Sequence, residues 1–311
     1  MSASDLTGFL RGRGVDALDV VPLLGGEKNR SWLVDDAFVA RSYSSSTPAE
    51  VEYELHATEF LAARGFPTPT PIRADDGSLW GWIDDRPAAL FTYAAGTHPT
   101  DLIDGYFSPD LHLGRNTARL AAQLHMLTAD QTFPGRRTTR LDPLERIQRF
   151  LRSPYADLPV LRDAIRHLTD LQRKIAAVYA NPADLRQGLV HNDISAVNLL
   201  LDEPGDITAL IDFDDCMTSF QLYDLGRIAE TWGRTPDRHA DLTRIKHLIE
   251  AYDATRPLTT READLALDFI ATYAAATGAD YLTNMLDAGA KVDDPADSYS
   301  MLFFLDLIGE Q

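Results

Sequence analysis

Apolar and polar residues alternate along the first third of the chain in a pattern that predicts short β-strands with one helix among them. SWLVDD and AFVARSY are apolar runs joined at Asp35 and Asp36, an arrangement that is typical of a β-hairpin. Thr47 and Pro48 suit the start of a helix, AEVEYELHATEFLAARG, which ends at Gly65. SLWGWIDD and PAALFTY predict a second strand pair. Residues 1–94 therefore predict a small β-rich N-terminal lobe.

After residue 94 the apolar residues follow the three- and four-residue spacing of helices. That spacing runs through LHLGRNTARLAAQLHML, LERIQRFL and VLRDAIRHLTDLQRKIAAVY, and it returns from YDLGRIAETWG to the C-terminus. Three short apolar runs interrupt it, and we expect the first two, GLV and LLL, to pair as a hairpin, with ITALIDF as the next strand. The pattern predicts an α+β protein with a larger, mainly helical lobe over residues 95–311.

A polar island separates the two runs of the predicted hairpin in the stretch GLVHNDISAVNLLL. His191, Asn192 and Asp193 form the island, and Asn198 follows five residues after the aspartate. Because buried polar groups need partners, the island is either a surface loop or a site. Asp212 ends the next apolar run, so these side chains can converge. An amide oxygen and a carboxylate suit Mg²⁺, and a second carboxylate can accept a hydroxyl proton, which is the minimum for phosphoryl transfer.

The segments HNDISAVNLLL and ALIDFDDCMTSFQLYDLG resemble two motifs of the aminoglycoside phosphotransferase and choline kinase group of protein-kinase-like enzymes. Within that group the chain is most similar to the homoserine kinase and hydroxylysine kinase branch, which also includes bacterial stress-response kinases. The resemblance implies a two-lobed protein-kinase-like fold. It also implies that Asp193 is the catalytic base, that Asn198 and Asp212 bind Mg²⁺, and that His191 holds the backbone of the catalytic loop. Ser195 stands where protein kinases often have lysine, which favours a small-molecule acceptor.

The same resemblance implies that the N-terminal lobe binds ATP. Arg41, on the third strand, takes the place of the usual lysine that holds the phosphates, and it keeps the positive charge with a different reach. Glu54 matches the helix glutamate that pairs with this cation, and Glu50, one turn earlier, is its competitor. The turn GGEKNRS would cover the phosphates, although a plain β-turn explains it as well. The residues expected at the turn and at the adenine-binding hinge are Gly25, Gly26, Phe91 and Tyr93.

The acceptor should lie beyond Asp193, among the C-terminal helices. An acidic and aromatic lining would suit an amino group, while helix amphipathicity explains the same residues without a ligand. Asp224 resembles a structural aspartate that braces the catalytic loop, and His125 is interpreted as a structural histidine. The candidate acceptor residues are Asp214, Asp215, Trp232, Asp280 and Tyr281.

Composition narrows the partners of the protein. The net charge is −18, which disfavours nucleic acid and anionic membranes, although a gain in solubility also explains it. Cys216 is the only cysteine, and no apolar run is long enough to span a membrane, so we expect a cytoplasmic protein. The function expected is an ATP- and Mg²⁺-dependent kinase of a small hydroxylated, amine-bearing molecule. A Ser/Thr protein kinase of the stress-response type, a sugar kinase and a nucleotide-binding regulator are the alternatives.

Overall fold

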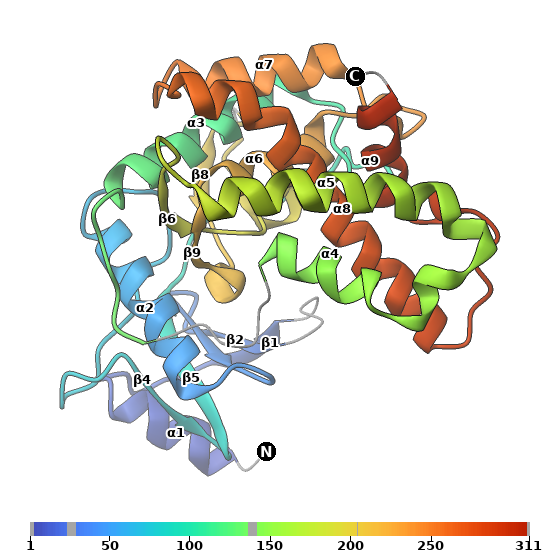
Figure 1. The fold of residues 1–311 in the computed structure, drawn as a ribbon. Helices are drawn as coiled ribbons and strands as arrows, with labels where there is room; N and C mark the ends of the chain where they lie inside the picture. The colour runs from blue at the N-terminus through green and yellow to red at the C-terminus, as the bar shows by residue number, and fades with distance from the viewer. Residues whose placement is uncertain (1–2, 24–28, 136–141, 204, 310–311) are drawn as a thin grey trace. The chain divides into compact units, whose positions relative to one another are not determined.

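The chain folds into two compact units in the computed structural model, which describes residues 3–23, 29–135, 142–203 and 205–309 (Figure 1). The first unit contains the described residues within 1–98, 130–140 and 198–216. The second contains those within 99–129, 141–197 and 217–311. Within these described ranges, no helix is long and apolar enough to cross a membrane.

A five-stranded antiparallel sheet forms the centre of the first unit, with the strand order β1-β2-β3-β5-β4. Its strands are β1 (Val20–Leu23), β2 (Arg30–Val34), β3 (Phe38–Ser42), β4 (Trp80–Ile83) and β5 (Arg86–Thr92). The predicted hairpin turns at Asp35 and Asp36, which both have a φ of 51°. Aspartate tolerates this left-handed backbone, which tight hairpin turns require. Both predicted strand pairs are confirmed.

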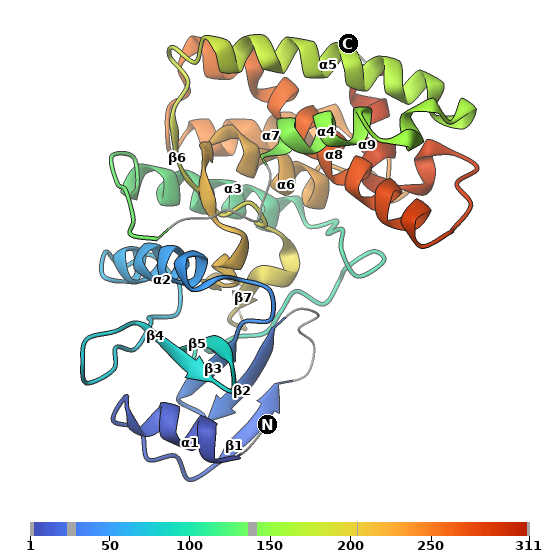
Figure 2. The same cartoon turned by 60° about the horizontal axis from the view of Figure 1, so that its bottom comes forward.

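Two helices cover the opposite faces of this sheet, as Figure 2 shows. In β5, Ala88 and Leu90 join the apolar cluster under α1 (Ala3–Arg11), whereas Ala89 and Phe91 join the cluster under α2 (Pro48–Ala62). The prediction of one helix in this region is wrong, because α1 is a second one. A second helix is needed because β5 is apolar on both faces, and each apolar face has to be covered.

The first turn of α2 distinguishes the two glutamates that compete for the predicted ion pair. Thr47 caps the helix, and its amide donates to Oε2 of Glu50 at 2.8 Å in a capping box. Glu54 lies one turn later on the same helix and points to the side chain of Tyr43. Glu50 is therefore a cap, and Glu54 is the glutamate that faces the sheet.

The predicted pairing of GLV with LLL is wrong. β6 (Gln187–Val190) pairs with β9 (Met217–Phe220) in the second unit, and β7 (Leu199–Leu201) pairs with β8 (Ile207–Leu210) in the first. Few residues separate β7 from β8, and Gly205 among them has a φ of 90°, so the two strands close a local hairpin. The longer polar stretch between β6 and β7 makes no such turn, and β9 was not predicted as a strand.

The second unit is mainly helical, as predicted. Its α-helices in the described ranges are α3 (Leu111–Leu127), α4 (Pro143–Leu151), α5 (Arg162–Ala180), α6 (Leu222–Trp232), α7 (Leu242–Asp253), α8 (Thr260–Asp287) and α9 (Tyr299–Gly309). The long helix α8 packs against α4, α5, α6 and α9. Gly226 lets α6 approach α8 closely, because a Cβ atom there would lie 2.3 Å from Cβ of Tyr273. This close approach brings Tyr273 to the polar island.

Candidate active site

The polar island follows β6, and its backbone is held by buried side chains of the second unit. Asp224, at the start of α6, accepts hydrogen bonds from the amides of His191 at 2.9 Å and Asn192 at 2.7 Å. The hydroxyl of Tyr273 donates to the carbonyl of Asn192 at 2.8 Å. Asn192 has a φ of 67°, a left-handed backbone that asparagine tolerates and that these bonds hold in place. Nδ1 of His191 accepts from the amide of Asp193 at 3.3 Å, so His191 contacts the loop backbone as predicted.

His125 completes the brace from α3. Its Nε2 lies 3.0 Å from Asp224, and its Nδ1 lies 2.7 Å from the hydroxyl of Tyr252. Burial lowers the pKa of His125, although Asp224 opposes the shift. A neutral imidazole can donate from Nε2 to Asp224 and accept from Tyr252, so both ring nitrogens are satisfied. The interpretations of Asp224 as a brace and of His125 as a structural histidine agree with these contacts.

Asp193, the predicted base, forms an ion pair with an arginine that the sequence analysis missed. Nε of Arg227 lies 2.8 Å from Oδ1 of Asp193, and the two side chains are 19% and 33% exposed. Burial alone would lower the pKa of Arg227, but Asp193 and other nearby groups raise it above its ordinary value, so the guanidinium stays charged. Arg227 follows Asp224 by three residues on α6. The signal in the sequence was therefore its helical position beside the brace.

Ser195 is buried, and its Oγ has no hydrogen-bond partner among the described residues.

The predicted metal ligands Asn198 and Asp212 lie close together in the first unit. Leu199 pairs with Leu210 in the β7–β8 ladder, and the amide of Ile211 donates to the carbonyl of Asn198 at 3.0 Å. The next residue, Asp212, has a φ of 68° and leads into a 3₁₀ helix, Phe213–Asp215. The described residues contain no group of three His, Cys, Asp or Glu that could hold a metal. One amide and one carboxylate are still a suitable donor set for a hard cation that keeps several waters.

Arg41 contacts a predicted metal ligand rather than the helix glutamate. Its Nη1 lies 2.7 Å from Oδ1 of Asp212, and the side chains are 18% and 35% exposed. Burial alone would lower the pKa of Arg41, but Asp212 and the other nearby groups raise it, which keeps the side chain charged. An ion pair of Arg41 with Glu54 is absent from the described contacts.

Glu54 instead forms a buried pair with Tyr43. The hydroxyl of Tyr43 donates to Oε1 of Glu54 at 2.9 Å, and both residues are buried. Oε2 of Glu54 is buried without a hydrogen-bond partner among the described residues. Burial raises the pKa of Glu54 to about 8, although the charge of Arg41 opposes the shift. Tyr43 directly follows β3 and lies two residues after Arg41, so the alternation of side chains along extended backbone places both on one face, where Tyr43 joins the cluster under α2.

The end of the predicted phosphate turn is also part of this network. Asn29 donates from Nδ2 to Asp214 at 3.0 Å and accepts from the amide of Ser44 at 3.2 Å. Sequence reasoning did not single out Asn29, because a polar turn residue gives no distinct signal. Gly25 and Gly26, predicted in the same turn, lie outside the described residues.

The predicted hinge continues from the end of β5. Phe91 is mostly buried against the α2 side of the sheet, and Tyr93 is 44% exposed. The amide of Thr92 donates to Thr70, and that of Tyr93 donates to the carbonyl of Ala37 at 2.8 Å. The segment is therefore bonded to Ala37, which precedes β3, and to Thr70 of a neighbouring loop.

The candidate acceptor residues fall in both units. Asp214 and Asp215 belong to the 3₁₀ helix of the first unit. In the second, Trp232 is fully buried against Gly114, and Asp280 pairs with Arg146 at 2.7 Å. The remaining candidate, Tyr281, is half exposed. The surroundings of these residues differ widely, so each has to be tested by itself.

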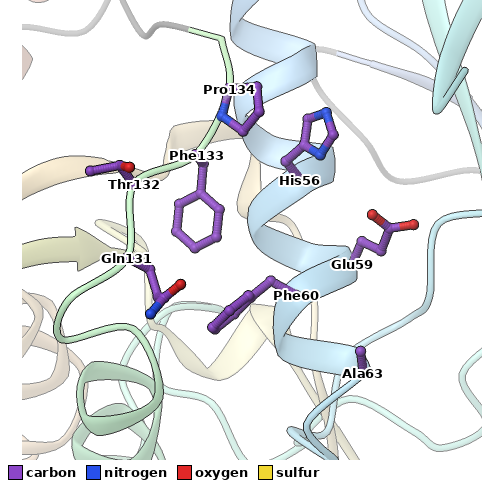
Figure 3. Close-up of a pocket in the computed structure, with 8 residues that line it drawn as sticks. All are labelled: His56, Glu59, Phe60, Ala63, Gln131, Thr132, Phe133 and Pro134. Atoms are coloured by element: carbon purple, nitrogen blue, oxygen red, sulfur yellow. The ribbon is translucent and has the colours of Figure 1, made fainter.

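A pocket of about 390 Å³ lies along α2 in the first unit (Figure 3). Its lining consists of His56, Glu59, Phe60, Ala63, Gln131, Thr132, Phe133 and Pro134. Phe133 extends toward α2 and packs edge-on against Tyr53 and Phe60, with ring centroids 6.0 and 5.5 Å apart. No predicted site residue lines this pocket. It marks the packing of residues 131–134 on the helix that carries Glu54.

Known proteins are similar to this chain over most of its length. The sequence profile of a family described as "Phosphotransferase enzyme family" matches residues 19–258. A homoserine kinase of Rhodospirillum rubrum is 27% identical over 318 residues, which cover 98% of this chain and 94% of that protein.

Solved structures are also similar to this chain over almost its whole length. A microcompartment-associated aminopropanol kinase has a TM-score of 0.69 at 21% identity and covers 96% of this chain and 93% of its own. An amicoumacin kinase, solved with AMP-PNP and Ca²⁺, has a TM-score of 0.67 at 15% identity, with coverages of 94% and 88%. These likenesses confirm the predicted α+β, protein-kinase-like fold.

Proposed function

Because this chain belongs to the phosphotransferase enzyme family, we propose that it uses ATP and Mg²⁺ to phosphorylate a small molecule that carries both a hydroxyl group and an amine. The broader statement, that it is a kinase of a small-molecule hydroxyl, follows from the family and its homoserine kinase relatives. The family also implies a nucleotide and a divalent metal, and the choice of Mg²⁺ is part of the proposal.

The position of Asn198 and Asp212 at one end of the β7–β8 ladder is the observation that carries the proposal. The β7–β8 pairing and the hydrogen bond from Ile211 to Asn198 bring one amide and one carboxylate together. This donor set fits Mg²⁺, which takes few protein ligands. When bound, the metal would neutralise charge on the phosphates. We propose that Asn198 and Asp212 hold it and that Arg41 contacts the phosphates.

We propose Asp193 as the group that accepts the proton of the attacking hydroxyl. Its backbone is fixed by His191 and by the brace of Asp224, and its Oδ1 is oriented by Arg227. A base held in this way meets the hydroxyl with little reorganisation, and positioning of this kind supplies much of the catalysis in phosphoryl transfer.

The remaining nucleotide contacts are proposed from the resemblance alone. We assign the phosphate turn to Gly25 and Gly26, the hinge to Phe91 and Tyr93, and a supporting role to Glu54. The lobes are proposed to divide at residue 94, with ATP bound by residues 1–94 and the acceptor by 95–311. A cytoplasmic location, with no nucleic-acid or membrane partner, remains the proposal that composition supports.

The amine on the acceptor is supported by the relatives and by charge. The relatives include a homoserine kinase and an aminopropanol kinase, and both names denote hydroxylated amines. The net charge of −18 attracts cations at long range, although salt screens this attraction beyond about 10 Å. Among the proposed acceptor residues, the partly exposed acids Asp214, Asp215 and Asp280 could contact an ammonium group.

An ADP-release screen tests this function. Wild-type protein is assayed with ATP or GTP, in Mg²⁺, against hydroxy amino acids, amino alcohols, aminoglycosides and neutral sugars. The proposal expects turnover with at least one hydroxylated amine and loss of that turnover in Asp193→Asn. Asp170→Asn should keep the turnover of the wild type, because Asp170 is a surface residue whose partner is the exposed Arg173. Faster turnover of neutral sugars than of every amine would contradict the acceptor class. Phosphate on Ser or Thr of added protein, or nucleotide binding without any turnover, would contradict the small-molecule kinase.

A further inference from the structure

We propose that Arg227 binds a carboxylate of the acceptor, so that the acceptor is a hydroxylated amino acid rather than an amino alcohol or an aminoglycoside. This inference rests on the proposed function and names the acceptor class more narrowly. It concerns only side chains of the second unit.

The first observation is the unused hydrogen-bonding capacity of Arg227. A guanidinium has five N–H donors. Nε of Arg227 contacts Asp193, and Nη1 lies 3.9 Å from Glu230, which is beyond hydrogen-bond distance. In the described part of the chain, no hydrogen bond is recorded for Nη1 or Nη2, and neither atom is among the buried polar atoms that lack a partner. The terminal edge of the guanidinium is therefore accessible and has donors to offer.

The second observation is the place of this edge beside the proposed base. The acceptor hydroxyl must come within about 2.6–3.2 Å of Asp193 to give up its proton. Arg227 contacts the same carboxylate, so a group bound to its Nη atoms lies only a few bonds from the reacting hydroxyl. The planar edge of a guanidinium matches a carboxylate, which it can bind through two parallel hydrogen bonds. A compact hydroxy acid fits these two requirements together.

The third observation is the local charge balance. Glu230 is fully buried and lies 3.9 Å from Arg227 and 3.9 Å from Arg234. Its two oxygens make no hydrogen bond to a described residue, so it stabilises Arg227 by charge and leaves the Nη donors unoccupied. The two arginines balance Asp193 and Glu230. A zwitterionic acceptor preserves this neutrality, whereas an amino alcohol adds a net positive charge beside Arg227.

Two matched acceptors separate this inference from its alternative. Homoserine and 3-aminopropan-1-ol share the hydroxyl, the amine and the chain between them, and only the first has a carboxylate. The kcat/KM of each is measured for the wild type, Arg227→Met, Arg227→Lys and Arg173→Met, the last being a control at a side chain that is 74% exposed.

We expect the wild type and Arg173→Met to prefer the carboxylated acceptor. Arg227→Met should lower that preference by about 10- to 100-fold, as expected for the loss of a charge-assisted contact. The loss should appear mainly in KM, and Arg227→Lys should restore part of the preference. Any effect of the substitution through Asp193 changes both acceptors alike and cancels in the ratio.

The outcomes distinguish this inference from the proposed function. An unchanged preference in Arg227→Met, with both rates lowered equally, would show that Arg227 acts through Asp193 alone and would overturn the inference. Equal use of both acceptors by the wild type would overturn it too, and in either case the proposed function would stand. Failure of the wild type to use any hydroxylated amine would overturn both. If Arg227→Met has no measurable turnover, calorimetric binding of the two acceptors with a non-hydrolysable ATP analogue gives the same ratio.

Discussion

Each of the two units contains a partly buried arginine–aspartate pair, and the two pairs have almost the same length and exposure. The first unit pairs Arg41 with Asp212 at 2.7 Å, and the side chains are 18% and 35% exposed. The second pairs Arg227 with Asp193 at 2.8 Å, at 19% and 33% exposure. The pairs differ in what holds the aspartate. The backbone before Asp193 is braced by Asp224, whereas Asp212 lies two residues after the end of β8 and follows Ile211, whose amide donates to Asn198.

This difference shows that an ion pair alone does not define a role. We expect the pair of Arg41 and Asp212 to separate when phosphate and metal compete for its two members, because both are assigned to binding ATP and Mg²⁺. We expect the pair of Arg227 and Asp193 to persist, because it orients the base.

Replacement of the base should have the largest effect on turnover. Asp193→Asn removes the proton acceptor at nearly constant volume, and we expect kcat to fall about 10²- to 10⁴-fold. The KM for ATP should change little. Steady-state kinetics and the melting temperature are the measurements. Turnover close to that of the wild type would remove Asp193 from the role of base.

The brace beneath the base should matter chiefly for stability. Asp224→Ala leaves the buried amides of His191 and Asn192 without their acceptor, at a cost of about 2–5 kcal/mol in the free energy of unfolding. Urea denaturation measures this loss. The exposed Asp163→Ala serves as control and should change stability by less than about 0.5 kcal/mol. Equal stability of the two variants would contradict the brace.

A lysine should replace Arg41 in part, because it also carries a positive charge. Arg41→Ala should raise the KM for ATP about 10- to 100-fold, the loss expected for a charge-assisted contact to phosphate. Arg41→Lys should recover part of this loss, and the exposed Arg64→Ala should leave the KM unchanged. A KM that does not respond to Arg41→Ala would show that Arg41 serves only Asp212.

A separate effect, on stability and not on turnover, should appear in the pH dependence of unfolding. Burial raises the pKa of Glu54 from 4.5 to about 8, so between these values the folded protein binds more protons than the unfolded chain. Stability contributed by protonated Glu54 is therefore fully present below pH 4.5 and is lost as the pH rises toward 8.

Glu54→Gln should remove this slope. The difference in unfolding free energy between the wild type and the variant, measured without nucleotide across this pH range, should change in favour of the variant as pH rises. A difference that is independent of pH would mean that Glu54 is ionised in the folded protein.

Residues whose partners are near in the sequence were predictable. The turn at Asp35 and Asp36, the cap at Thr47 and the helical segments depend on neighbouring residues, and the structure confirms them. The motif from His191 to Asn198 was recognisable because its polar residues occupy fixed offsets between apolar runs. The contact from His191 to the amide of Asp193 is similarly local.

The sequence by itself thus determined the local elements, the chemistry of the polar island and the family resemblance, since each depends on residue types at short spacing. Only the tertiary structure decided that β6 pairs with β9, that Glu54 meets Tyr43, and that α1 covers the second face of the sheet. It also decided the two arginine pairs, whose members are 171 and 34 residues apart. The physical reason is that a charged side chain pairs with whichever opposite charge the packed strands and helices bring within reach. Spacing along the chain does not by itself decide that choice.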